Sequence, residues 1–481
     1  MKFTKFGKTL LMSTLSMGII FGVSSCVVSY TVGYLYVTGT ETAQSGNNGI
    51  ITGLKIDHNT GHLSQVNGLP ISSGGSNPVR AILTVGSKFI YVLNRGANAE
   101  GNGDCTTDDP CLNANITEFA VGGNGILTPQ ETFYTQGLNP FRLLVDSTGS
   151  YIFALEHDSI GADGVNASSP TNQNPNCALA LGSIVTNGTC GDISIFSINQ
   201  TTGRLSTILN TQVTQANCPG GATSCPLPYF PVPANPIDFL LSAGYMLTLD
   251  GTPATGDSIF PYAYSSGQLE LSQNGPQPLT DPYSSSTSGP SAGLVTQATA
   301  LVAAGGVYYV LDNEPISIIF DCPSGQTCSP TVSDSQILPY TLGTNGALQA
   351  AASGIIPDAS TLANPTWLMV ESKGKYVYVA NQGNNTTDTN NPESGIAAYF
   401  ITSSSNPLSF VSDQPFGSGS GPQCIVEDPS NQYIYEANFY DSTVTGRVLD
   451  PNSGELDNMR VNSTYTLKGP ATWCLVDGRT G

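Results

Sequence analysis

The chain has 481 residues, of which only 10% are charged, while Gly (53) and Pro (32) are abundant. This composition is typical of many short strands joined by turns. The 35 acidic residues outnumber the 15 basic residues and give a net charge of −20. Such a chain repels phosphate groups, which excludes nucleic acids and anionic lipid surfaces as general partners.

Residues 1–26 predict an export signal rather than part of the fold. Lysines among the first eight residues precede an apolar run, residues 9–23, that is too short to span a bilayer comfortably. The run ends in Val-Ser-Ser-Cys, which resembles a bacterial lipobox and predicts lipidation of Cys26. The alternative is an ordinary secretory signal with an incidental cysteine. On the first interpretation residues 27–33 are a tether, and the protein is an envelope lipoprotein that contacts the membrane only through its lipid.

Ten cysteines follow Cys26, an even number in a chain with an export signal, which predicts disulfide bonds. Eight of them form four close pairs, and the last two lie far apart. Pairing between neighbours is a hypothesis, since ten cysteines permit many other pairings. The spacing CxxC is absent from the sequence, so we expect neither a metal site nor a cofactor. The expected disulfide cysteines are Cys105, Cys111, Cys177, Cys190, Cys218, Cys225, Cys322, Cys328, Cys424 and Cys474.

One strand pattern recurs seven times after the tether. Its clearest copy is KYVYVANQG, residues 375–383, and each copy is a β-branched and aromatic run that ends in a small or polar residue. A unit repeated in this way predicts modules stacked against their own copies. The other copies begin at Tyr34, Phe89, Tyr151, Tyr245, Val307 and Tyr433.

Each copy is the second strand, B, of a predicted four-stranded antiparallel meander, A to D. In most copies strand A follows an Asn-Pro or Gly-Pro pair, and strands C and D are joined by a tight turn. The chain begins with a lone B strand, YLYVTG, and ends with a lone A strand, GPATWCLVDG. Pairing of these two strands would close a ring and remove its open edges. We therefore predict an all-β, seven-bladed β-propeller over residues 34–481.

The long insertions fall on one end of the blades. In a meander the B–C and D–A connections share one end, and these are the long ones here, while the A–B and C–D turns are short. We call the end with the long connections the crown face. It holds all four close cysteine pairs, and we expect it to carry the function. The insertions are residues 95–114, 157–191, 313–334 and 382–394 between B and C, and about 210–235 and 279–295 between D and A.

Four residues at one position are candidates for ligand binding. Arg80, Arg142, Asp238 and Trp367 each lie two residues after a strand-A proline, which places them at the channel mouth on the crown face. Two arginines there could hold a carboxylate or phosphate through paired hydrogen bonds. The alternative is that the arginines only pair with strand-end carboxylates such as Asp238. Trp367 could stack on a sugar or pack between blades.

Histidine is scarce, and His157 is the candidate for acid–base chemistry. It follows a B strand between Glu156 and Asp158 and opens a long crown insertion. The alternative is a solvated loop histidine. His58 and His62 flank a C–D turn on the opposite face, which predicts solvated turn residues.

The segments NPFRLLVDSTGSYIFAL, ISIFSINQTTGRL and KYVYVANQG together resemble the lactonase family of seven-bladed propellers, which includes 6-phosphogluconolactonase-like proteins, and also YVTN-repeat propellers of cell surfaces. The resemblance covers about residues 34–481. It implies a monomeric lactone hydrolase in which Arg80 and Arg142 bind an anionic group and His157 or Glu156 activates water.

Lactonase-like enzymes commonly carry a histidine directly after the strand-A proline, and this chain never does. A second hypothesis is therefore a non-catalytic envelope propeller that binds a protein or glycan through disulfide-linked crown loops. The residues at the position in question are Val79, Phe141, Ile237, Thr366 and Gln423.

Overall fold

The computed structural model describes residues 30–41, 48–84, 86–98, 105, 111–160, 174–182, 189–215, 218, 222–251, 256–271, 276–281, 293–318, 331–350, 356–358, 361–383, 394–402 and 408–478. The chain divides into two compact units, Met1–Tyr30 and Thr31–Gly481, and the fold below is that of the second unit. The expected signal and Cys26 lie outside the described residues. Within these residues, no helix is long and apolar enough to cross a membrane.

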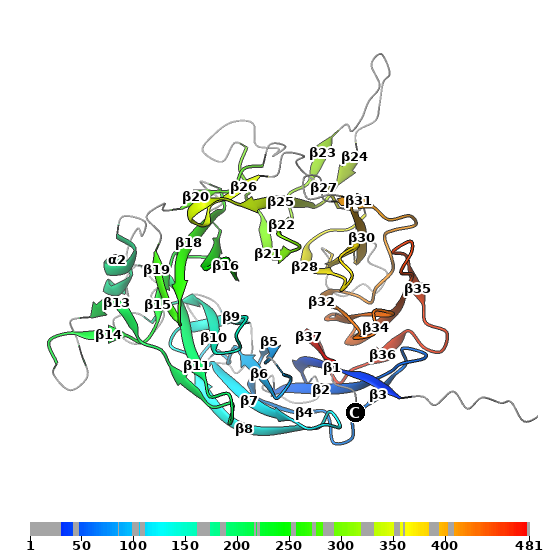
Figure 1. The fold of residues 1–481 in the computed structure, drawn as a ribbon, viewed down its shortest axis with the longest axis horizontal. Coiled ribbons are helices and arrows are strands. Elements are labelled where there is room, and N and C mark those ends of the chain that lie inside the picture. The colour runs from blue at the N-terminus through cyan, green and yellow to red at the C-terminus, as the bar shows by residue number, and fades with distance from the viewer. Residues whose placement is uncertain are drawn as a thin grey trace, which may run out of the picture. The chain divides into compact units, whose positions relative to one another are not determined.

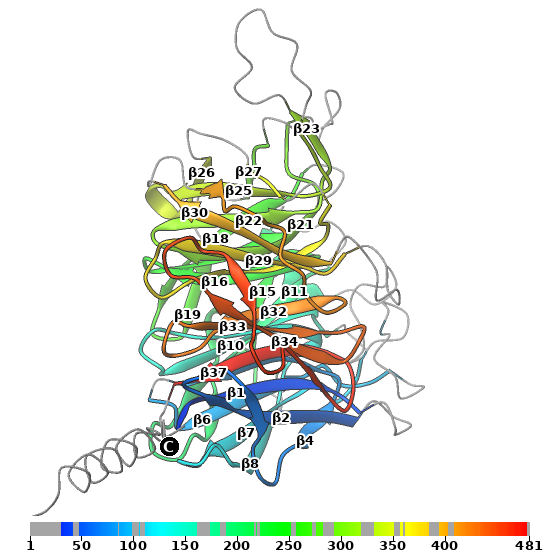
Figure 2. The same ribbon diagram turned by 90° about the vertical axis from the view of Figure 1, so that its right-hand side faces the viewer.

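Seven antiparallel sheets of four or five strands form a ring, each with its A strand innermost (Figure 1). Viewed at right angles, the blade strands run roughly along the central axis (Figure 2). The predicted fold, a seven-bladed propeller of four-stranded antiparallel blades, is confirmed.

Each blade has four main strands, A to D in order from the channel outward. Blade 1 has β5 (Pro78–Leu83), β6 (Phe89–Asn94), β7 (Asn115–Val121) and β8 (Leu127–Tyr134). Blade 2 has β9 (Leu138–Val145), β10 (Tyr151–Asp158), β11 (Gly191–Ile198) and β12 (Leu205–Thr207). Blade 3 has β16 (Pro236–Ser242), β17 (Tyr245–Asp250), β18 (Ser258–Ser265) and β19 (Gln268–Leu271). Blade 4 has β21 (Ala298–Ala304), β22 (Val307–Asp312), β25 (Gln336–Leu342) and β26 (Leu348–Ala350).

Blade 5 has β28 (Pro365–Val370), β29 (Tyr376–Asn381), β30 (Gly395–Ile401) and β31 (Leu408–Phe410). Blade 6 has β32 (Pro422–Glu427), β33 (Tyr433–Asn438), β34 (Thr443–Leu449) and β35 (Leu456–Asn458). Blade 7 has β37 (Ala471–Asp477), β1 (Thr31–Thr40), β2 (Asn48–Asp57) and β3 (Leu63–Gln65). Additional strands pair with C strands: β4 (Ile71–Ser76), β15 (Phe230–Val232), β20 (Gln277–Pro278), β27 (Ile356–Pro357) and β36 (Thr464–Thr466). The insertions contain the helix α2 (Pro175–Leu181). They also contain two hairpins, one of β13 (Asn210–Gln215) and β14 (Cys225–Leu227) and one of β23 (Ile316–Ile318) and β24 (Thr331–Ser333). The 3-10 helix η3 (Thr344–Gly346) lies in the C–D turn of blade 4.

Blade 7 combines strands from both ends of the propeller. Strand β1 pairs with β37 from Tyr34 opposite Asp477 to Gly39 opposite Ala471, so the last strand of the chain is the innermost strand of the blade that contains the first. Strand β1 begins at Thr31, and residues 31–33, expected as part of the tether, therefore belong to the strand.

A contact between neighbouring blades explains the recurrence of YxY in the B strands. The ring of Tyr376 packs on Gly454 in the C–D turn of the next blade, and the Tyr378 hydroxyl donates to the Gly454 carbonyl at 2.9 Å. The same pair of contacts joins Tyr34 and Tyr36 to Gly125, Phe89 and Tyr91 to Gly203, and Tyr433 and Tyr435 to Gly61. The repeated tyrosines thus bury their rings between blades and satisfy their hydroxyls there.

We expect Gly454→Ala to destabilise the protein by about 2–3 kcal/mol, because the residue has φ +76° and an added Cβ would collide with the Tyr376 ring. Gly374→Ala is the matched control: its φ is +69°, but no atom lies within 4 Å of the added Cβ. Urea unfolding of both variants separates the cost of the backbone conformation from that of the collision. Equal losses of unfolding free energy in the two variants would show that the collision with the Tyr376 ring adds no cost.

The described crown insertions contain the expected disulfides. Cys105 bonds to Cys111, Cys177 to Cys190 and Cys218 to Cys225, while Cys322 and Cys328 lie outside the described residues. The fourth described disulfide, Cys424–Cys474, joins β32 to β37. Pairing between sequence neighbours is therefore confirmed for the three close pairs that are described.

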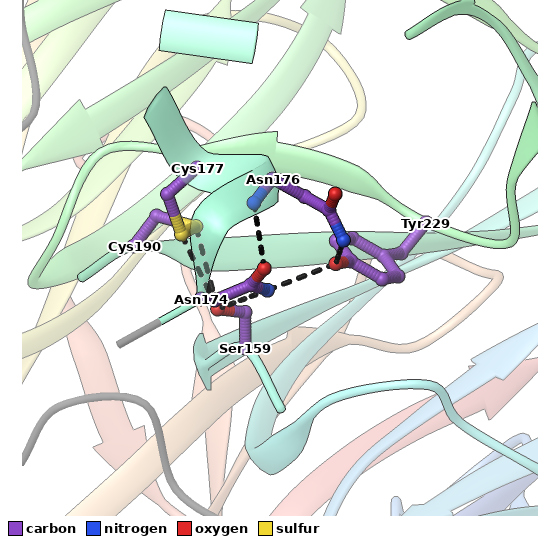
Figure 3. The surroundings of a disulfide bond; sticks show 6 residues. All are labelled: Ser159, Asn174, Asn176, Cys177, Cys190 and Tyr229. Carbon is purple, nitrogen blue, oxygen red and sulfur yellow. Dashed lines mark hydrogen bonds between the residues drawn. A yellow bond between two sulfur atoms is a disulfide. The ribbon is translucent and has the colours of Figure 1, made fainter. Parts of the chain in front are cut away.

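The Cys177–Cys190 disulfide sits in a polar network that joins two insertions (Figure 3). Asn174, the N-cap of α2, donates to the Tyr229 hydroxyl at 2.9 Å and to Ser159 Oγ at 3.2 Å. Ser159 Oγ lies 3.3 Å from Cys190 Sγ. The B–C insertion of blade 2 is thereby fixed to the D–A insertion that follows the same blade.

Candidate functional site

The Asn-Pro and Gly-Pro pairs build the channel mouth. In blades 1, 2, 3, 5 and 6 the residue before the proline adopts a left-handed conformation, which Asn and Gly tolerate best. A β-bulge follows in every A strand, one residue after the proline in blade 1, so that Val79 is left out of the strand pairing. The bulged residues of the seven A strands are Val79, Phe141, Ile237, Thr299, Thr366, Gln423 and Thr472.

Six of these seven bulged residues, all but Ile237, line a cavity of about 370 Å³ at the crown end of the channel, which we call the mouth cavity. The bulge therefore turns one side chain per blade toward a common centre. This is the position at which lactonase-like enzymes commonly carry histidine, and here it presents Val, Phe, Thr and Gln. Three arginines, Arg80, Arg95 and Arg142, complete the charged part of the wall.

Arg142 is the arginine with a carboxylate partner. Its Nε lies 3.1 Å from Asp238 Oδ1, and Asp238 is 3% exposed. Asp238 also accepts from the backbone N–H groups of Phe239 and Leu301. The structure thus brings two of the predicted residues together as an ion pair, and a fifth of the Arg142 side chain remains exposed.

Arg80 is held by aromatic rings instead. Its guanidinium carbon lies 3.4 Å from the ring centroid of Trp473 and 4.8 Å from that of Trp367, and the two indoles meet edge to face. Among the described residues no carboxylate forms an ion pair with Arg80. Burial, and then the nearby Arg142 charge, lower the pKa of Arg80 well below its usual value, while Asp238 opposes them. A bound anion would offset this burial of charge.

Trp367 lies deeper than the mouth cavity. It lines a second cavity of about 200 Å³, which also includes Arg80, Arg142 and Trp473. Arg80 lies over the ring of Trp367, and Arg80, Arg142 and Trp473 line both cavities.

Arg95 is a site residue that the repeated pattern did not predict. It directly follows β6, and its Nε is buried without a hydrogen-bond partner among the described residues. Burial lowers the pKa of Arg95, and the charge of Asp158 partly reverses that effect. A basic residue immediately after a B strand, at the crown end, is the signal that could have identified it. The mouth cavity thus gathers three cations near the paired carboxylate of Asp238 and has the electrostatics of an anion site.

His157 stands at the rim of the mouth cavity. Its Nδ1 lies 3.2 Å from Asp158 Oδ1, and its ring centroid lies 6.5 Å from that of the cavity residue Phe141. Asp158 is in turn held by Asn139, whose Nδ2 donates to Asp158 Oδ2 at 2.7 Å. The His157 side chain is 39% exposed. With Nδ1 directed at a carboxylate, Nε2 is left to accept a proton.

Glu156 faces the blade interior. It is 0% exposed, and its Oε2 accepts from the Gly137 N–H at 2.8 Å and from Ser194 Oγ at 3.0 Å. Asp192 lies opposite it in the register and is equally buried. Burial raises the pKa of both carboxyls, that of Asp192 well above its usual value. Glu156 is buried and is not among the residues that line the mouth cavity, and its role in activating water stays a prediction.

The comparisons with known proteins agree with this architecture. Residues 329–472 match the family described as "Lactonase, 7-bladed beta-propeller". No curated protein matches the chain. A solved putative 6-phosphogluconolactonase from Bacteroides uniformis is 13% identical, with a TM-score of 0.55 over 93% of this chain and 100% of that chain. One from Bacteroides fragilis is 14% identical, with a TM-score of 0.56 over 93% and 98%.

The periplasmic gluconolactonase PpgL from Pseudomonas aeruginosa is 15% identical to this chain. Its TM-score is 0.57 over 92% of this chain and 99% of that chain. At such identities the likeness concerns the fold alone. The protein is thus a seven-bladed β-propeller whose residues 329–472 match the lactonase family.

Proposed function

We propose that the protein is an exported lactone hydrolase acting on a sugar or organic-acid lactone that carries a negative charge. The observation that carries this proposal is the mouth cavity, where Arg80, Arg95 and Arg142 gather near the paired carboxylate of Asp238. Its volume of about 370 Å³ lies within the range of small-molecule sites.

The chemistry assigns separate roles to the cavity wall and its rim. The arginines bind the carboxylate or phosphate of the lactone and fix its ring, with Asp238 and the two indoles holding Arg142 and Arg80 in place. At the rim, His157 Nε2 takes a proton from a water molecule that attacks the lactone carbonyl, and Asp158 orients the imidazole. The ring C–O bond then breaks, and the leaving oxygen receives the proton.

The solved propellers named as a putative 6-phosphogluconolactonase and a periplasmic gluconolactonase support the reaction class, and the four described disulfides support export. Lipidation at Cys26 would retain the protein at the cell envelope. We expect the protein to be a monomer there.

The direct test is hydrolysis of a panel of lactones by the purified protein. 6-Phosphogluconolactone and other anionic lactones should be hydrolysed faster than uncharged glucono-lactone. Hydrolysis no faster than in buffer across the panel would contradict the proposal and leave binding of an envelope protein or glycan by the crown face as the function.

Replacing His157 with asparagine should lower kcat by about 100-fold with little change in KM, because general-base catalysis typically contributes at least that factor. His62→Asn is the matched control, since His62 lies against the Tyr465 ring on the opposite face. A kcat of the His157 variant equal to that of the His62 control would remove His157 from the mechanism.

A further inference from the structure

Three carboxylates meet in the interior where blade 3 leads into blade 4. Asp281 follows β20, Asp312 ends β22, and Glu314 lies two residues further on. One oxygen from each of them lies within 4.8 Å of the other two, and none of the three side chains is more than 3% exposed.

A fourth side chain, Gln336, reaches into this cluster. It begins β25 opposite Asp312, and its Nε2 lies 2.7 Å from both Asp281 Oδ2 and Asp312 Oδ2. Gln336 is 0% exposed. Its Oε1 and Asp312 Oδ1 are both buried without a hydrogen-bond partner among the described residues. Unsatisfied buried acceptors are rare in native interiors, so these two oxygens indicate a missing ligand.

The charge of the cluster points in the same direction. The carboxylates of Glu314, Asp281 and Asp257 all act on Asp312 as like charges. Within the described part of the chain, no lysine or arginine forms an ion pair with Asp312. Such a group of buried carboxylates requires either protons or a cation.

We propose that Asp281, Asp312, Glu314 and Gln336 form a calcium site. The three carboxylates offer only oxygen atoms, which hard cations prefer, and neither histidine nor cysteine belongs to the cluster. Calcium accepts irregular arrangements of many protein oxygens, whereas magnesium retains water and requires octahedral geometry. Rotation of the Gln336 amide would direct its oxygen at the ion, because an amide can present either its nitrogen or its oxygen.

The site would fix one side of the crown face. It joins the connection after β20, the end of β22 and the start of β25. Asp312 also pairs with Ala298 of β21, next to the mouth-cavity residue Thr299. Calcium would thereby tie the insertions around blade 4 to the wall of the channel. This role is independent of any hydrolytic activity.

Calcium binding can be measured on the whole protein after EDTA treatment, with CaCl₂ as the probe and MgCl₂ for comparison. We expect calorimetry to show a site weakened at least 100-fold by Asp312→Asn. At calcium concentrations about 100 times Kd, the Tm of the unmodified protein should rise by about 3 °C. In EDTA, Asp312→Asn should unfold at the same temperature or higher, because it removes a repelling charge and retains an acceptor for Gln336.

Asp192→Asn is the matched control, since Asp192 occupies the position of Gln336 in blade 2, within a buried carboxyl pair. It should retain the calcium-dependent rise in Tm. Glu314→Gln provides a second variant should Asp312→Asn fail to fold. Absence of calcium binding in the unmodified protein would overturn the proposal, as would an undiminished Tm shift in the Asp312 or Glu314 variant.

Discussion

Replacing Arg80 and Arg142 together with methionine is expected to lower kcat/KM for an anionic lactone by about 1,000-fold. A hydrogen bond to a charged group is worth about 1.5–3 kcal/mol, so losing two corresponds to about 3–6 kcal/mol, and factors of 100 to more than 10,000 follow. Methionine keeps much of the side-chain volume next to Trp473 and removes the charge. Initial-rate measurements with charged and uncharged lactones would show whether the loss follows the charge of the substrate.

Comparing charged and uncharged substrates distinguishes loss of anion binding from general damage to the channel. If the arginines hold the anion, hydrolysis of the uncharged lactone should change by less than 10-fold in the same variant. Arg204→Met is the matched control, because Arg204 pairs with Glu131 on the surface, 66% exposed, and should leave both rates unchanged. An equal loss for both substrates would mean that the double variant damages the channel, for example by leaving Asp238 buried without Arg142, and would contradict the assignment.

The blade count could be predicted from the sequence because each repeated position meets the same physical demand. The tyrosines of YVYVAN pack on a turn glycine of the next blade, as Tyr376 does on Gly454, so the pattern must recur in most blades. The Asn-Pro pairs recur because the residue two positions before the bulge adopts a left-handed conformation in blades 1, 2, 3 and 5. A contact that is made in most blades requires the same residue type at the same position of each repeat, and it can therefore be recognised in the sequence.

The mouth residues were predictable for the same reason, and their partners were not. Arg80, Arg142, Asp238 and Trp367 share one offset from the proline, and the structure places them at one level of the channel. The sandwich of Arg80 between two indoles joins blades 1, 5 and 7, and spacing along the chain does not reveal it.

Residues outside the repeated pattern escaped prediction. Asp192 meets Glu156 across an insertion of more than 30 residues, and the cluster of Asp281, Asp312 and Gln336 draws on three separate segments. The B–C insertions differ in length from blade to blade. The sequence therefore does not show which residue of a C strand lies opposite which residue of the B strand, and the structure does. The buried carboxyls are therefore the part of this molecule that required the structure.

Removal of the Cys424–Cys474 disulfide is expected to cause the largest loss of stability of any change considered. The bond joins β32 to β37, the innermost strands of blades 6 and 7, and β37 is the terminal strand that pairs with β1. Closing a loop of about 51 residues in the unfolded chain corresponds to about 4 kcal/mol. Both cysteines are at most 2% exposed, so Cys424→Ala/Cys474→Ala avoids burying a hydroxyl.

The control is Cys105→Ala/Cys111→Ala, which opens a loop of about seven residues and should cost about 2.4 kcal/mol on the same entropy scale. Denaturant unfolding of both variants gives the comparison, and proteolysis near the C-terminus should accelerate only in the Cys424 variant, because β37 then depends on strand pairing alone. A smaller loss from the Cys424 variant than from the control would show that pairing with β1 already secures β37. In that case the ring would be held closed by backbone hydrogen bonds and the packing of Trp473, and the disulfide would be a local feature of the channel wall.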